Sequence, residues 1–470
     1  MSTGRITGEL GRRTQRLIYG PLAPADIAAE LPLMLKVDRA HLVMLAEQQL
    51  VPVEAARRLL IAIDALAADP SPLSGRPAPR GLYLMYEGYL IERLGADIGG
   101  VLHSGRSRND LKATIAYLAF TDWLLEFAEQ ATRLEAILLA RARAYESVVM
   151  PVYTHFQAAM PISYGYYLLG VAVAVGRELD ALAAAAGGLR RCPLGASAVA
   201  GTDLPIEPAR TAELLGFAAP TDHALDAVAS RDVPLRLLAA AASLAVTLSR
   251  LATDLQLWST VEFGFIEFPD RLVGGSSAMP QKRNAFLLEH VKAKPGQVLG
   301  AWAAAASSMA GTPFTNSIEV GTEATGAIWP GLRAAEQSVL LSQVLVSGAR
   351  PVPARMAERA EAGFTAATTL ANRLVRQGIP FRTAHRRVGE AVRAAVAAGQ
   401  TSLPGFEDLD LPALVRSLAY GGGPGGFREP YERACAAWAG HRRWHQQWRA
   451  ALADADTKLA AAVASVVGQP

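Results

Sequence analysis

Residues 235–258, LRLLAAAASLAVTLSRLATDLQLW, decide the fold of this chain. The apolar residues that recur there in steps of four and three are Leu237, Ala241, Leu244, Leu248, Leu251, Leu255 and Trp258. This spacing places one apolar seam along a helix, and a second long helix must cover that seam. Residues 120–138 repeat the rhythm, and each segment spans about 30 Å as a helix. Because no strand alternation competes, the sequence predicts an all-α fold around a central bundle of long helices.

Alanine is frequent on these predicted helices, and its small side chain lets helix axes approach closely. Faces that are apolar most of the way round are typical of a helix buried in a large bundle. We therefore expect the bundle to oligomerise. A monomer with a thick core is the alternative.

The composition is that of a globular protein. The chain has 470 residues, of which 51% are apolar and 19% charged, which allows two or three domains with substantial cores. The formal net charge of +3 is nearly balanced. No block of Lys or Arg indicates a face for nucleic acid or membrane.

Other features of the sequence favour a cytoplasmic protein. Cys192 and Cys435 are isolated, so neither a disulfide framework nor a thiolate metal site is indicated. The opening stretch MSTGRITGELGRR lacks the apolar core of a signal peptide. Charged residues interrupt the longest apolar run, which argues against a membrane span.

Stretches rich in proline and glycine divide the chain. They lie at 69–81, 348–355 and 420–430. The predicted domains are an N-terminal helical domain (1–108), a central helical-bundle domain (109–350) and a C-terminal helical domain (351–470).

Four stretches are more polar than their surroundings: HSGRSRND (103–110), YTHFQ (153–157), PLGASAVAGTDLP (193–205) and GGSSAMPQKRN (274–284). Their donors suited to carboxylate oxygens are Arg108, Asn109, Thr154, Lys282 and Asn284. Together these groups indicate a site for an acidic small molecule.

Three of these stretches resemble the signature regions of argininosuccinate lyase, a family of the fumarase/aspartase superfamily. The motifs are HSGRSRND, YTHFQAAMPI and GGSSAMPQKRN, and the last is highly specific. GIPFRTAHRRVGEAV (378–392) also resembles the C-terminal domain of that family, and the similarity runs from about residue 85 to 400. The resemblance implies three helical domains in a homotetramer, with each active site drawn from three subunits and no cofactor or metal.

The resemblance also implies a reaction, the cleavage of an N-substituted aspartate into fumarate and an amine. The difficult step is removal of a Cβ proton, because the carbanion must spread its charge into the carboxylate as an aci-carboxylate held by fixed donors. Ser276 matches the base, on a loop whose two glycines suit a lid that closes over bound substrate. His155 matches the group that protonates the leaving nitrogen, and Glu289 matches the glutamate that orients it.

The remaining site residues follow from the same motifs. Those matching catalytic or substrate-binding positions are Lys282, Asn284, Ser277, Ser107, Arg108, Asn109, Thr154 and Gln157. Arg231 and Asp232 are interpreted as scaffold.

The chain departs from the family where the family holds arginine. Arg80–Gly81–Leu82–Tyr83 replaces the family's EDIH, and residues 316–324 (NSIEVGTEA) replace YNxDxQEDK. Each half-paired polar group in a closed site costs about 1–3 kcal/mol. We therefore expect a leaving amine other than arginine. The candidates to bind it are Tyr83, Asn316, Glu319 and Glu323.

Two other hypotheses remain, an authentic argininosuccinate lyase and a non-catalytic protein on this scaffold. The joint presence of Ser276, His155, Lys282 and Asn284 argues against the second. The sequence names neither the amine nor the physiological direction. His441 and His445 are four residues apart, but with no carboxylate nearby in the sequence they are predicted to be surface residues.

Overall fold

The computed structural model describes residues 10–20, 22–78, 81–401, 403, 410–421 and 424–468. Arg80 and the first nine residues, which entered the sequence analysis, lie outside this set. The described chain is mostly helical, which confirms the all-α fold.

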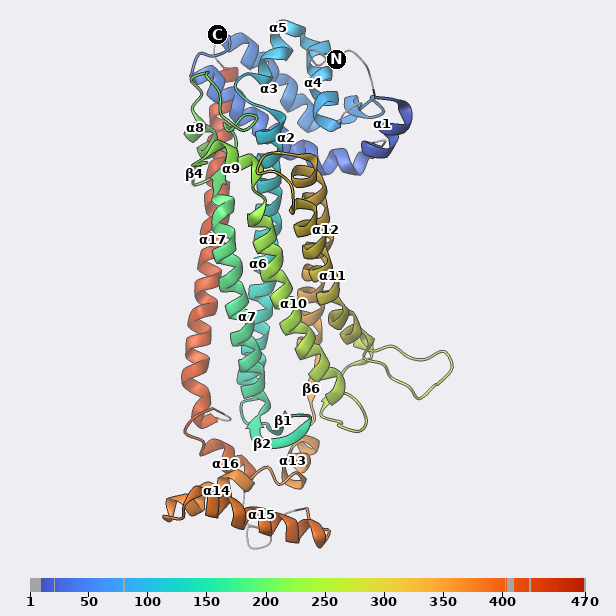
Figure 1. Cartoon of the computed structure of the whole chain (residues 1–470), viewed down its shortest axis with the longest axis vertical. Coiled ribbons are helices and arrows are strands. Elements are labelled where there is room, and N and C mark those ends of the chain that lie inside the picture. The colour runs from blue at the N-terminus through green and yellow to red at the C-terminus, as the bar shows by residue number, and fades with distance from the viewer. Residues whose placement is uncertain are drawn as a thin grey trace.

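Long helices lie side by side along the molecule (Figure 1). They are α6 (Arg108–Ala144), α7 (Tyr164–Ala186), α10 (Asp232–Trp258), α11 (Phe286–Met309) and α12 (Thr325–Gly348). A further helix, α17 (Pro424–Val467), runs back along the bundle against α6 and α7.

The two apolar seams predicted from the sequence lie inside this bundle. Every seam residue of α10, from Leu237 to Trp258, is buried, and so is the α6 seam from Phe120 to Leu138. Phe120 also stacks on Trp329 of α12, with ring centroids 4.7 Å apart. The apolar periodicity of each helix therefore predicted which of its faces is buried in the bundle.

α10 is long and apolar enough to cross a membrane when judged by length and composition. However, 56% of its most apolar window is buried inside the protein, where it packs against α7, α11 and α12. Its composition is that of a core helix.

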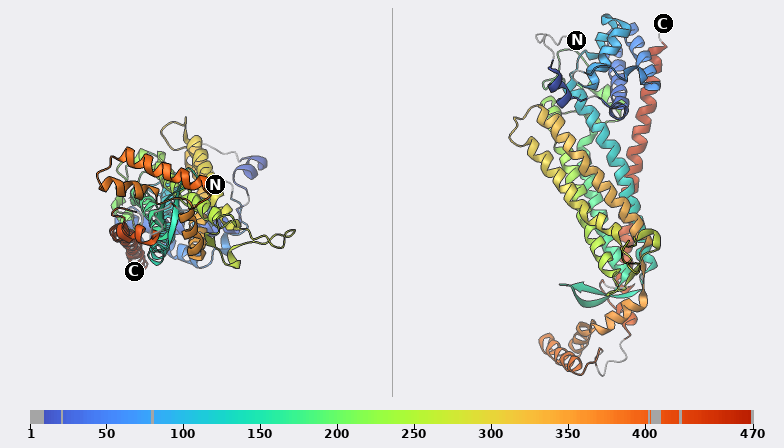
Figure 2. Two further views of the ribbon diagram at one scale, coloured as in Figure 1. Left: turned by 90° about the horizontal axis from the view of Figure 1, so that it is seen from below. Right: turned by 90° about the vertical axis from the view of Figure 1, so that its right-hand side faces the viewer.

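Smaller elements cover the two ends of the bundle (Figures 1 and 2). At one end lie α1 (Arg12–Ile18), α2 (Pro24–Glu47), α3 (Val53–Ala68), α4 (Leu82–Leu94), α5 (Ala96–Gly99), α8 (Pro208–Leu215) and α9 (Ala224–Ala229). At the other lie α13 (Pro353–Ala362), α14 (Ala367–Arg376), α15 (Phe381–Ala397) and α16 (Leu411–Arg416). α14 and α15 share a small core of their own. The predicted domain boundaries stay a prediction.

The strands of the described chain form three short pairs. An antiparallel hairpin joins β1 (Val149–Thr154) to β2 (Gln157–Ser163) beyond the end of α6. The others pair β3 (Arg191–Cys192) with β4 (Ala219–Pro220) and β5 (Ile266–Glu267) with β6 (Arg350–Pro351).

One side of the bundle leaves apolar side chains in solvent. α11 buries only a narrow stripe, while its Leu299 and Trp302 are 49% and 40% exposed. Leu340 and Val344 of α12 are exposed in the same way. We call these four residues the α11–α12 apolar face.

The prediction that His441 is a surface residue is wrong. His441 of α17 is buried, with its Nδ1 2.9 Å from Glu135 Oε2 of α6 and its Nε2 3.1 Å from Asp180 Oδ1 of α7. Both carboxylates come from helices more than 200 residues earlier, so inspection of the neighbouring sequence missed them. Because both ring nitrogens face acceptors, the ring is held as an imidazolium.

We expect His441→Ala to lower the free energy of unfolding at pH 6 by about 3 kcal/mol, because it leaves the buried Glu135 carboxylate without its partner. Burial alone would lower the pKa of His441, but its bonds to Glu135 and Asp180 raise it overall. The folded pKa thus lies above the unfolded one, so this stabilisation is complete below the unfolded pKa and is lost as pH rises through the folded pKa. Urea unfolding at fixed protein concentration measures the free energy of unfolding of wild type and variant. The difference between the two should be smaller at pH 9 than at pH 6. A gap independent of pH would contradict this account.

Candidate active site

The first polar stretch, 103–110, leads into the start of α6. Ser107 is the N-cap residue, and its Oγ accepts a hydrogen bond from the Asn109 N–H at 3.3 Å. Asp110 completes a capping box, because its Oδ1 accepts from the Ser107 N–H at 2.9 Å. Arg108 and Asn109 therefore lie half-buried in the first turn. The helix dipole favours an anion at this position, although Ser107 and Asp110 already accept hydrogen bonds from the N–H groups of Asn109 and Leu111.

Asp110 also joins the first polar stretch to the third. Its Oδ2 accepts hydrogen bonds from the backbone N–H groups of Gly195 at 3.1 Å and Ser197 at 2.8 Å. Asn109 adds a bond from its side-chain amide to the Ala198 carbonyl at 3.2 Å. Burial raises the pKa of Asp110 to about 6, although these backbone donors oppose the rise.

Two contacts with α2 fix the loop before α6. Arg106 Nη1 donates to Asp38 Oδ1 at 2.6 Å, and both side chains are fully buried. Burial, followed by the Arg106 charge, lowers the pKa of His41 well below its usual value. The neutral His41 ring therefore donates from Nε2 to the Ser104 carbonyl, 2.8 Å away. These contacts give Arg108 and Asn109 a rigid support.

Tyr83 is a buried residue of α4 that contacts the same loop through His103. Its hydroxyl is 2.6 Å from His103 Nδ1 and 3.1 Å from Glu87 Oε1. Burial, then the Arg106 and Arg108 charges, lower the pKa of His103 to about 4, so the imidazole is neutral. Burial raises the pKa of Glu87. The predicted amine-binding role of Tyr83 thus falls on a hydroxyl that already has two partners.

Asn316 and Glu319 lie between α11 and α12, at the same end of the bundle as Tyr83 (Figure 1). Glu319 opens a short π-helix, η5 (Glu319–Ala324), which packs against α6 and α9. Its carboxylate is exposed, and hydrogen bonds from its own backbone N–H and the Ser317 hydroxyl lower its pKa. π-Helical turns are frequent at functional sites.

The second polar stretch forms the tip of the β1–β2 hairpin. Thr154 pairs with Gln157 across a two-residue turn made by His155 and Phe156. Both turn residues have positive φ, +51° and +60°, as a tight two-residue hairpin requires. A left-handed conformation costs a residue other than glycine about 1–2 kcal/mol.

This turn holds predicted site residues in solvent. Thr154, His155 and Gln157 are exposed, and Phe156 is 83% exposed. Strained backbone of this kind persists where the surrounding structure and function require it. In one chain the hairpin presents His155 outward.

The fourth stretch, 274–284, is a loop closed at its base. Gly274 and Asn284 exchange two backbone hydrogen bonds of 2.8 Å. Arg283 ties the same base to Asp270 and donates to the Phe268 carbonyl at 2.9 Å. The residues between project from the bundle (Figure 1).

Within this loop, Ser276 is half-buried while Ser277 and Lys282 are exposed. Ser276 Oγ accepts hydrogen bonds from the backbone N–H groups of Ala278 at 3.3 Å and Met279 at 3.1 Å. Glu289 follows on α11, where its Oε1 accepts from Gln256 of α10 at 3.1 Å. No hydrogen bond joins Glu289 to His155 among the described residues of one chain.

The predicted site residues therefore form three separate groups (Figures 1 and 2). Tyr83, Ser107, Arg108, Asn109, Asn316 and Glu319 lie at one end of the bundle, the hairpin group lies at the other, and the 274–284 loop projects from the side. α6 has 37 residues and separates its first turn from the hairpin by about 55 Å. One chain alone does not bring Arg108, His155 and Ser276 together.

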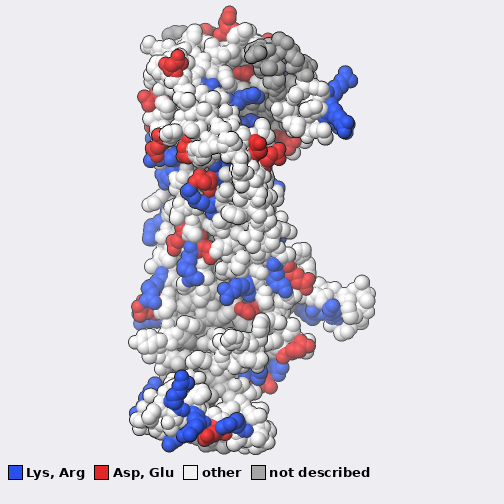
Figure 3. Space-filling view, viewed as in Figure 1, with Lys and Arg blue, Asp and Glu red and all other residues white. Residues whose placement is uncertain are grey.

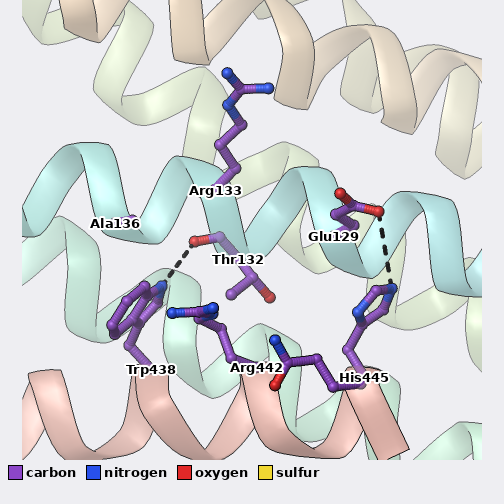
Figure 4. A pocket seen from close by; sticks show the side chains of 8 residues that line it. Glu129, Thr132, Arg133, Ala136, Trp438, Arg442 and His445 are labelled. Carbon is purple, nitrogen blue, oxygen red and sulfur yellow. Dashed lines mark hydrogen bonds and ion pairs between the residues drawn. The ribbon is translucent and has the colours of Figure 1, made fainter. Parts of the chain in front are cut away.

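Two cavities differ in their relation to these groups. One of about 410 Å³ lies beside the hairpin and is lined by Gln157, Tyr153 and Arg359, among others. Another of about 420 Å³ lies between α6 and α17, away from the predicted site (Figure 4). There Trp438 Nε1 donates to the Thr132 carbonyl at 3.1 Å, and His445 Nε2 lies 4.0 Å from Glu129.

Sequence analysis missed Glu87 and gave no role to His103. The spacing from Tyr83 to Glu87 is one helical turn, so a helix over these residues would have placed them on one face. Nothing in the sequence indicated that His103 would reach the same hydroxyl, because that contact depends on how α4 packs.

Comparison with known proteins was consistent across three kinds of match. A family model described as "Lyase" matches residues 85–300, and one described as "Argininosuccinate lyase C-terminal" matches residues 364–416. The argininosuccinate lyase of Methanoculleus marisnigri is 39% identical over 392 residues, covering 83% of this chain and 79% of its own. That of Methanothrix thermoacetophila is 37% identical, covering 81% and 76%.

Solved structures with the same fold include EDDS lyase in complex with formate. It has a TM-score of 0.85 and 28% identity, covering 98% of this chain and 97% of its own. A variant of EDDS lyase with bound fumarate superposes equally well. A 3-carboxy-cis,cis-muconate lactonizing enzyme from Pseudomonas putida shares the fold at 20% identity, with a TM-score of 0.67 over 90% and 98% of the chains.

We expect Asp110→Ala to lower the free energy of unfolding by about 3 kcal/mol, because it removes the acceptor of two half-buried backbone N–H groups, those of Gly195 and Ser197 in the 193–205 loop. Chemical denaturation at one protein concentration measures the change. Asp122→Ala, at an exposed position of the same helix, is the control and should change stability by less than about 0.5 kcal/mol. Equal effects of the two substitutions would show that Asp110 does not hold the loop.

Proposed function

Because the chain belongs to the fumarase/aspartase superfamily as an argininosuccinate lyase-like carbon–nitrogen lyase, we propose that it releases fumarate from an N-substituted L-aspartate whose leaving amine is not arginine. One observation carries this proposal. Arg108 and Asn109 keep a rigid support suited to the succinyl carboxylates, while Tyr83 stands where the family has a histidine. In this proposal the residues that bind the succinyl part match those of the family, and the residues around the leaving amine differ from them.

In the proposed reaction Ser276 takes the Cβ proton. A serine is a weak base unless its alkoxide is stabilised, and two backbone N–H groups already point at Ser276 Oγ. The electron pair left on Cβ spreads into the adjacent carboxylate as an aci-carboxylate, whose charge Lys282 neutralises and to which Asn284 donates a hydrogen bond. Ser277, Arg108 and Thr154 hold the carboxylates.

Collapse of this intermediate forms the Cα–Cβ double bond and breaks the C–N bond. The nitrogen takes a proton from His155, directly or through water, and leaves as the amine. Glu289 orients His155 and stabilises its protonated form. Gln157 supports the residues that bind the carboxylates. Because Glu289 and His155 do not meet within one chain, this step also needs groups from more than one subunit.

The proposal therefore includes a cytoplasmic homotetramer that uses neither a cofactor nor a metal. Its support is the separation of the first turn of α6 from the hairpin by about 55 Å, the projection of the 274–284 loop from the side of the bundle, and the α11–α12 apolar face. Few charged side chains interrupt the surface over the upper half of α11 and α12 (Figure 3). In the proposed assembly, the 274–284 loop of one chain lies beside the start of α6 of another.

Authentic argininosuccinate lyase is the second candidate. It is favoured by relatives of that name that are up to 39% identical over four-fifths of this chain. Against it stand Tyr83, Asn316 and Ala324, which replace the polar groups that the family uses around arginine.

A mixing experiment tests the shared site. Ser276→Ala and Arg108→Ala are each expected to be inactive when pure, and Ser276→Ala should still bind fumarate because the base acts in the transition state. Co-expression in equal amounts should restore about a quarter of wild-type turnover, since random assembly leaves that share of sites with both groups intact. Fumarate absorbance gives the rate, and light scattering gives the mass of the mixed tetramer.

Two results would overturn the shared site. One is mixed enzyme no more active than its inactive parents. The other is a monomer that turns over N-succinyl amines at the full rate.

The second test concerns the amine. We expect kcat/KM for argininosuccinate to be at least about a hundredfold below that for the preferred N-succinyl amine, because several polar partners of arginine are replaced. A panel of amines added to fumarate, followed by the loss of its absorbance, identifies the preferred one. Argininosuccinate cleavage at about 10⁴ M⁻¹s⁻¹ or faster would instead establish the second candidate.

A further inference from the structure

We infer that the cavity between α6 and α17 is a second ligand site, which binds small monocarboxylates with an apolar body. The cavity measures about 420 Å³, a volume typical of sites for small organic molecules. Thr132 of α6 lines it, together with Trp438, Arg442 and His445 of α17 (Figure 4). The inference goes beyond the proposed function, because the described residues that line the cavity include none of those predicted to act on the substrate.

A buried hydroxyl without a partner lies at this cavity. Thr132 is only 6% exposed, and its Oγ1 has no hydrogen-bond partner within the described parts of the chain. In Figure 4 this hydroxyl points toward α17. The hydroxyls of Thr114 and Thr121 on the same helix instead donate to the carbonyl four residues earlier, at 2.7 and 2.8 Å. The Thr132 hydroxyl is therefore available to a partner from outside the chain, and leaving it unpaired costs free energy.

Two further groups in the cavity can donate to an anion. The Arg442 guanidinium lies over the Trp438 ring, 5.0 Å from its centre, and pairs with no carboxylate in the part of the chain that is described. His445 Nε2 also lacks a hydrogen bond to any described residue, because its 4.0 Å separation from Glu129 is too long for one. Arg133 lines the cavity as well, although its side chain points away from α17 (Figure 4). The stacked guanidinium is thus the cation best placed to bind a planar carboxylate.

The remaining lining residues determine which body the ligand has. Trp438 and Ala136 add apolar surface, which a bare ion would leave in contact with water. Glu129 lies beside His445 and carries the only carboxylate among the described residues of the lining. It would repel a second carboxylate on the ligand. One carboxylate on a compact apolar body therefore fits this cavity, whereas a dicarboxylate such as fumarate does not.

The position of the cavity leaves it open to solvent. α17 runs along the side of the bundle away from α11 (Figures 1 and 2). A second copy that covers the α11–α12 apolar face therefore does not cover the cavity. Thr132 also lies about 36 Å along α6 from Arg108. A ligand can thus be bound here at the same time as the substrate.

Isothermal titration calorimetry on the full-length enzyme tests the site with benzoate, in the presence of saturating fumarate. We expect a Kd of about 1 mM or lower, the same as without fumarate. Benzylamine has a similar shape and the opposite charge, so it should not bind. Inorganic phosphate should bind at least about tenfold more weakly than benzoate, because it leaves the apolar walls uncovered. Equal affinities for phosphate and benzoate would overturn the carboxylate class.

Two substitutions locate the ligand. Arg442→Gln should raise the Kd for benzoate at least about tenfold, because it removes the cation. Thr132→Val should raise it at least about threefold, because it removes the hydroxyl but keeps the backbone carbonyl that Trp438 binds. The melting temperature of Thr132→Val should equal or exceed that of wild type, since no hydrogen bond within the fold is lost.

Arg449→Gln is the matched control, because Arg449 lies on the same helix but pairs with Glu126, 3.6 Å away, outside the cavity. It should change the Kd less than about twofold. The inference is overturned if benzoate does not bind, if fumarate displaces it, or if Arg442→Gln binds it as wild type does. A lower melting temperature of Thr132→Val would also overturn it, because the hydroxyl would then have a partner within the fold.

Discussion

The stiffness of α6 is the constraint on which the rest of this structure depends. Its 37 residues hold Arg108 and the His155 hairpin about 55 Å apart, and its buried seam fixes α7, α12 and α17 along that length. No hinge in α6 can bring the two groups together without breaking the core. Exposure of the hairpin tip, the projecting 274–284 loop and the α11–α12 apolar face then have one common explanation. In the proposed tetramer, each is a surface that meets another copy of the chain.

The parts of the proposed site differ in how firmly they are held. The buried Arg106–Asp38 pair holds the loop before α6 against α2, and Asp110 binds the 193–205 loop to the start of α6. The groups expected to hold substrate charge are therefore preorganised. The base loop is held only at its ends, by the Gly274–Asn284 bridge and by Arg283. That contrast suits a reaction in which the carboxylates bind first and the base arrives on closure.

The sequence predicted what depends on local pattern and missed what depends on packing. The seams from Leu237 to Trp258 and from Phe120 to Leu138 were readable because helical periodicity is local. The burial of His441 was not, because its partners Glu135 and Asp180 come from two distant helices. The site motifs predicted a set of donors, and the family resemblance supplied roles for them that stay predictions. Their distribution over three places along the bundle followed only from the lengths of the helices between them.

The two halves of the proposed site also differ in what their chemistry permits. Elimination to fumarate needs charge held at two carboxylates and a base at Cβ, so any change among Arg108, Lys282 and Ser276 acts on every substrate alike. The amine half only has to hold the leaving group, and it can be rebuilt without disturbing the base. Tyr83 illustrates how this occurs: its hydroxyl reaches His103, in the same loop as Arg108, from behind. In the proposed site, a change at this buried position therefore acts on the surroundings of the leaving amine while Arg108, Lys282 and Ser276 stay unchanged.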